Sequence, residues 1–136
     1  MELRGKGKFW LGTLASGIFM WVLAGLWHEV ILAEFYRTEK HADHEGTALI
    51  FVAYLLLAGL MSLLYGRWRR SGSWLEGLAF GVLAGLLWVF PHELAMAGAH
   101  GESIGYVFKN AVWYSAEQGF GGLVLAWVFR GKFKSG

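Results

Sequence analysis

Two adjacent His-Glu pairs, His28-Glu29 and His92-Glu93, carry the most reactive side chains of this sequence, and each pair lies in a long apolar segment. Ionisable residues in such a segment are costly unless they are paired, protonated or bound to a metal. Neutral imidazole and carboxylate together form the mixed ligand set that suits Zn, Fe or Mn. With Glu117 as a third carboxylate, these residues predict a transition-metal site.

The predicted metal site forms one layer across the apolar segments. His28, His92 and Glu117 each lie about eight residues inside the expected outer end of their segment, which is roughly 12 Å of helix. Tyr54 lies at the same depth on the second segment, where we expect it to contact the ligands or a substrate. Such a site suits redox or hydrolytic chemistry at the outer face, and whether the protein is an enzyme stays open.

Two other interpretations of the His-Glu pairs stay open beside the metal site. His28 and His92 have the placement of axial ligands of a b-type haem, although the adjacent acids suit a porphyrin pocket poorly. In that case Trp27 and Trp88 would line a haem or pigment pocket. Alternatively, the pairs form a neutral hydrogen-bonded network that serves only to fix helix packing.

A second group of polar residues lies at the expected outer surface. His41 and His44 are three positions apart, which places them on one face where a helix begins. His100 and Glu102 occupy the other outer loop. We include His41 and His44 in the predicted metal site, as residues that recruit the ion, and the alternative is an ordinary hydrated loop.

Four apolar segments must position these groups. The chain has 136 residues, of which 56% are hydrophobic and 16% charged, a composition unusual for a soluble domain of that size. A helix crosses the hydrocarbon core with about 20 mostly apolar residues. Residues 9–35, 46–66, 74–98 and 106–129 each meet this requirement. The sequence therefore predicts an all-α membrane protein, a single domain over residues 1–136 with four transmembrane helices.

The basic residues indicate the orientation of these helices. Nine of the twelve Lys and Arg residues flank the segments on one side of the expected topology: Arg4, Lys6, Lys8, Arg67, Arg69, Arg70, Arg130, Lys132 and Lys134. The positive-inside rule makes this side cytoplasmic, so we expect both termini inside the cell and the metal site facing the periplasm or exterior of an inner membrane. Basic residues in groups of three at helix ends are typical of a bilayer partner, and nucleic acid is not expected.

The sequence also contains a tandem repeat. A shift of about 64 residues aligns Trp10 with Trp74 and places the first His-Glu pair on the second. We predict two helical hairpins, over residues 9–66 and 74–130, related by an axis along the membrane normal. The two pairs would then meet at this axis. Pro91 distinguishes the second copy, and we expect a kink or an unwound turn beside it.

The cytoplasmic half of the segments contains few polar side chains. Below the predicted layer, the candidate relays are Thr13, Ser16, Ser62 and Glu76, which do not form a continuous polar path. A channel or proton-driven transporter needs such a path. The pattern therefore favours a binding or reactive site that is open to the outside and closed beneath.

The last two segments resemble known proteins. The succession of a Gly-rich span, a short polar hairpin and a span reading Ala116-Glu117-Gln118-Gly119-Phe120-Gly121-Gly122 before Trp127-Val128-Phe129 is similar to that of small four-helix bacterial membrane proteins of uncharacterised function. This resemblance implies the fold and no activity. The many small residues are also typical of helix contacts, so a homodimer or a subunit of a larger membrane complex is expected as the assembled form.

Overall fold

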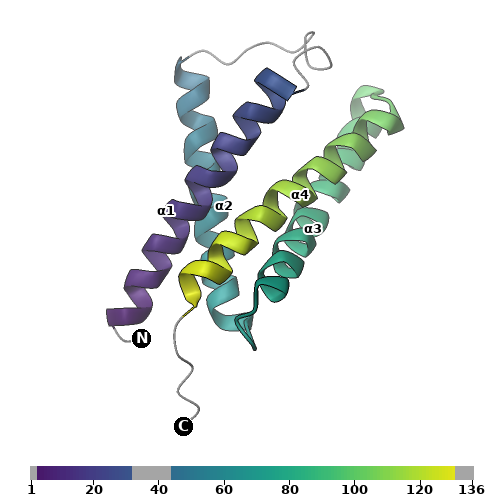
Figure 1. Cartoon of the computed structure of the whole chain (residues 1–136). Helices are drawn as coiled ribbons and strands as arrows, with labels where there is room; N and C mark the ends of the chain where they lie inside the picture. Colours follow the sequence, from purple (N-terminus) through teal and green to yellow (C-terminus); the bar gives the residue numbers. More distant parts are fainter. Residues whose placement is uncertain (1–2, 32–43, 131–136) are drawn as a thin grey trace.

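The computed structural model describes residues 3–31 and 44–130, and all of its regular structure is helical (Figure 1). Its elements are α1 (Leu3–Leu26), the π-helix η1 (Trp27–Ile31), α2 (His44–Trp68), α3 (Trp74–His100) and α4 (Ile104–Phe129). α2, α3 and α4 begin and end close to the predicted apolar segments, whereas α1 begins at Leu3, six residues before the predicted start, and residues 32–35 of its predicted segment lie outside the described residues. The all-helical fold class is therefore confirmed.

Three of the helical segments are long and apolar enough to cross a membrane, namely Gly5–Val30, Gly46–Trp68 and Trp74–His100. The fourth helix, α4, has 26 residues, but Lys109, Asn110, Glu117 and Gln118 lower its hydropathy. It is also the helix with the most buried residues. The inner position of α4 explains why its sequence can be less apolar than that of its neighbours.

The helices form two hairpins that pack unequally. α3 and α4 lie against each other along their length, and α1 packs on both α2 and α4. α2 approaches α3 and α4 at only a few positions, and α1 and α3 do not contact each other. The start of α1, the α2–α3 connection and the end of α4 lie at one end of the bundle (Figure 1).

Glycine allows α3 and α4 to meet backbone to backbone. A Cβ atom at Gly81 would overlap the carbonyl of Gln118, and one at Gly122 would overlap the carbonyl of Gly77. Gly85 faces the backbone of Ser115 in the same way. This close approach maximises van der Waals contact, which is the main attraction between helices in a bilayer.

The polar side chains of α1 and α2 that the sequence offered as candidate relays are partly used in helix packing. Ser16 Oγ donates to the carbonyl of Gly121 over 3.1 Å and so joins α1 to α4, while Thr13 Oγ1 bonds its own helix at Phe9 O. Ser62 is buried without a hydrogen-bond partner. These side chains belong to contacts within and between helices.

Glu76, a candidate relay in the sequence, belongs to the α2–α3 connection. Its carboxylate accepts hydrogen bonds from the backbone amides of Arg70, Ser71 and Gly72. Ser73 Oγ accepts from Glu76 N over 3.1 Å, which caps the start of α3. Glu76 therefore fixes a tight turn between two helices and is not part of a relay.

The helical irregularity lies at the first His-Glu pair and not at the second. α3 stays α-helical through Pro91, so of the two expected alternatives the unwound turn does not occur there, and the kink stays a prediction. Instead, the chain widens into the π-helix η1 after α1, and this turn carries His28 and Glu29. A π-turn inside a longer helix is rare and frequently marks a functional position.

The glycine contact between α3 and α4 can be tested with one methyl group. We expect Gly81→Ala to lower the unfolding free energy by about 1–3 kcal/mol, because the added Cβ atom forces two backbones apart. Gly98→Ala on the same helix is the control, since a Cβ atom there has open space around it. Thermal unfolding in detergent measures both, and equal melting temperatures would contradict the backbone contact.

Candidate functional site

A cleft lies between α2 and α3, which contact each other at only a few positions. Its volume is about 690 Å³, with α2 and α3 as its walls and α4 at its base. The walls are largely aliphatic, and Leu56, Leu60 and Leu87 are more than half exposed in the isolated chain. If these helices cross a membrane, the cleft opens sideways to the lipid.

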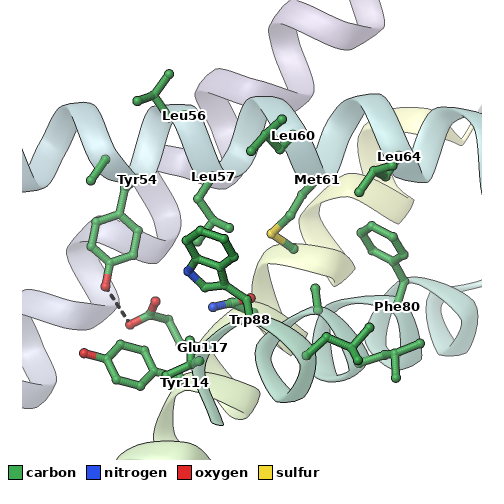
Figure 2. Close-up of a pocket in the computed structure, with 16 residues that line it drawn as sticks. Tyr54, Leu56, Leu57, Leu60, Met61, Leu64, Phe80, Trp88, Tyr114 and Glu117 are labelled. Atoms are coloured by element: carbon green, nitrogen blue, oxygen red, sulfur yellow. Dashed lines mark hydrogen bonds between the residues drawn. The ribbon is translucent and has the colours of Figure 1, made fainter. Parts of the chain in front are cut away.

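The polar atoms of the cleft gather near one end. Figure 2 shows Tyr54, Tyr114 and Glu117 together at this end, with Leu64 and Phe80 at the other. Tyr54 Oη donates a hydrogen bond of 3.1 Å to Glu117 Oε2, which links α2 to α4. The structure thus brings together two members of the predicted layer, Tyr54 and Glu117, which are 63 residues apart in sequence.

Two buried oxygen atoms at this end have no hydrogen-bond partner. Glu117 is 0% exposed and Gln118 is 1% exposed, and Oε1 of each side chain is unpaired. A buried polar atom without a partner costs about 1–3 kcal/mol. Both residues line the cleft.

The Glu117 carboxyl group also lacks a charged partner. Within residues 3–31 and 44–130, no Lys, Arg or His side chain forms an ion pair with it, and the donor side chains beside it, Tyr54 and Trp113, are both neutral. A lone carboxylate at a buried membrane position costs several kcal/mol. This position therefore favours the neutral acid or a bound cation.

Aromatic side chains surround the carboxyl group. The Trp88 indole reaches into the cleft from α3, and the phenol rings of Tyr54 and Tyr114 lie on two sides of the Glu117 carboxyl group (Figure 2). Trp88 is 69% exposed, so its ring stands at the open side. Rings of this kind bind apolar molecules and attract cations to their faces.

The first His-Glu pair lies away from this cleft. His28 is half-buried, with Nδ1 3.0 Å from the carbonyl of Ala24, and Glu29 is exposed. The neighbouring Trp27 stacks on Trp113 with ring centroids 4.1 Å apart. Of the two tryptophans predicted to line one pocket, only Trp88 lines the cleft.

The second pair also lies apart from the first. His92 is exposed, while Glu93 is half-buried and accepts a hydrogen bond of 3.4 Å from Asn110 Nδ2. Among the described elements, η1, which carries the first pair, does not lie beside α3, which carries the second, so the structure does not bring the two pairs together at an axis. The Glu93–Asn110 bond instead joins α3 to α4.

The predicted metal ligands are not assembled in the part of the chain that the structure describes. No three His, Asp or Glu side chains there lie close enough to hold a metal ion. His41 lies outside the described residues, and His44 begins α2 with a side chain that is also outside them. Metal binding by these residues stays a prediction from the sequence.

The sequence alone did not identify Gln118 or Tyr114 as residues of the site. Gln118 follows Glu117 directly, and an uncharged polar side chain deep in an apolar helix is itself a sign of a polar contact. Tyr114 gives no such sign, because tyrosine is common in packed helices. Its place beside Tyr54 depends on how α2 and α4 lie in space (Figure 2).

Comparisons with known proteins add no identification. Neither a protein-family model, nor a curated protein, nor a solved structure matches this chain. The function must therefore be inferred from the geometry of the cleft.

The unpaired oxygen atoms predict opposite effects of two substitutions in the ligand-free protein. We expect Gln118→Met to raise the unfolding free energy by about 1–3 kcal/mol, because it removes a buried acceptor that has no partner. Tyr54→Phe should lower it, because both oxygens of Glu117 then lack a partner. Thermal melts of delipidated protein compare the two, and a loss of stability in both variants would contradict the unpaired state of Gln118.

Proposed function

We propose that the protein is an integral inner-membrane protein of four spans that binds an amphiphilic small molecule from the bilayer in the α2–α3 cleft. Three helices have the length and apolarity to span. The proposal takes α4 as the fourth span, because α4 is as long as its neighbours and packs along α3. Its polar residues Asn110, Glu117 and Gln118 are all buried.

The proposed orientation places both termini in the cytoplasm. The start of α1 and the end of α4 lie at the same end of the bundle (Figure 1). Lys6, Lys8, Arg67, Arg69 and Arg130 belong to helix ends on this side. Lys8 and Arg69 also donate hydrogen bonds to the terminal carbonyl of α4 at Phe129. A basic end of this kind supports a cytoplasmic assignment.

We further propose that the two hairpins derive from a tandem repeat and that the cleft is the result of their unequal packing. α1 packs closely on α4, with the Ser16–Gly121 hydrogen bond between them. In a symmetric pair of hairpins, α2 would pack on α3 in the same manner. The cleft occupies the place of that missing interface.

The shape of the cleft carries the proposal of ligand binding. A volume of about 690 Å³ lies within the usual range of roughly 300–1,000 Å³ for small-molecule sites. Apolar walls with a few convergent polar groups are also typical of such sites. A ligand would place its apolar body between α2 and α3 and its polar head at Glu117 and Gln118.

Photolabelling of the protein in liposomes tests this function. A fatty alcohol with a photoreactive diazirine in its chain should label peptides of α2 and α3 that line the cleft. Ala84→Trp, which fills the cleft from α3, should lower this labelling at least about tenfold. Ala95→Trp is the matched control, because Ala95 is exposed on the same helix and does not line the cleft. Uniform labelling of all lipid-facing surfaces that Ala84→Trp does not change would refute the binding site.

A transition metal or haem at His28 and His92 stays a separate prediction from the sequence. A site made of both pairs would need η1 and α3 to approach each other, or ligands from outside the described residues such as His41. Metal analysis and an absorbance spectrum of the purified protein decide the question. Bound metal without a Soret band would support the metal site, and a Soret band would support haem. The absence of both would leave the pairs with a packing role.

A further inference from the structure

We propose that the occupant of the cleft is a hydrophobic amine, bound as its ammonium ion with the charge at Glu117. This inference rests on the proposed ligand binding and specifies the head group that the cleft takes. It follows from three properties of the polar end, namely its free acceptors, its unpaired carboxyl group and its aromatic rings.

Among the described residues, two buried oxygen atoms of cleft-lining side chains accept hydrogen bonds and have no partner. Glu117 Oε1 and Gln118 Oε1 line the same cleft, and the Tyr54 hydroxyl already donates to Glu117 Oε2. A ketone, ether or ester head group has no donor for these oxygens, and an alcohol has one. An ammonium group derived from a primary amine has three N–H donors and can serve both atoms at once.

The charge of an ammonium group also matches the site. Glu117 is the single Asp or Glu residue that lines the cleft, and among the described residues no basic side chain neutralises it. An organic cation compensates the carboxylate without the several carboxylate or imidazole ligands that a metal ion requires. The ion pair forms away from water, where the attraction between the charges is strong.

The rest of the cleft suits the remainder of such a ligand. The rings of Tyr54, Tyr114 and Trp88 stand around the carboxyl group, and an ammonium group near the face of an aromatic ring is attracted to it (Figure 2). Toward the other end, the cleft is lined by apolar side chains such as Leu64 and Phe80. These side chains would hold an aryl or alkyl body.

A matched pair of probes tests the charge of the head group. 4-Phenylbutylamine and 4-phenyl-1-butanol share one apolar body and differ in an ammonium or a hydroxyl head. Calorimetric titration of the full chain in detergent should show at least about tenfold tighter binding of the amine. Glu117→Gln keeps the size of the side chain and removes its charge. We expect it to abolish the preference for the amine while the alcohol still binds.

Glu93→Gln is the control for non-specific attraction of the amine. Glu93 lies on α3, outside the cleft, so this variant should keep the full preference for the amine. Equal affinity of the wild-type protein for the two probes would overturn the ammonium assignment and leave the cleft as a site for neutral amphiphiles. The same holds if Glu117→Gln keeps the preference. If neither probe binds and photolabelling also misses the cleft, the proposed function itself fails.

Discussion

The backbone contact between α3 and α4 is the constraint on which the rest of the structure depends. Gly77, Gly81 and Gly122 remove the side chains that would otherwise separate these helices, so α4 is held against α3 and is buried more than any other helix. α1 then covers a second side of α4. α2 is left with α1 as its main partner, and the space between α2 and α3 becomes the cleft.

This arrangement gives the cleft its chemistry, because it places the polar side of α4 at the base of an apolar space. The polar groups of Glu117 and Gln118 would cost free energy on a helix that faced lipid. In their buried position they also cost free energy unless a hydrogen-bond partner reaches them. Tyr54 supplies one hydrogen bond from α2. The remaining acceptors and the aromatic rings favour a ligand that carries a positive charge. Function and packing therefore follow from the same glycine-rich interface.

The sequence predicts the helices well, because 20-residue apolar segments and the turns between them are local properties. It also identifies Glu117 and Tyr54, since a carboxyl group in an apolar helix must find a partner. The assembly of the His-Glu pairs could not be predicted in the same way, because it depends on which helices touch. A repeat in sequence suggests symmetric packing, whereas the glycines of α3 and α4 favour one hairpin over the other. The cleft itself arises from this unequal packing.

A crystal structure of the protein grown from a lipidic phase, without added ligand, tests the central claim most directly. The expected result is an elongated density between α2 and α3 whose polar end lies within hydrogen-bond distance of Glu117 Oε1 and Gln118 Oε1. The contradicting result is α2 packed directly on α3 with no space between them and the Glu117 carboxylate paired with a basic side chain of the protein.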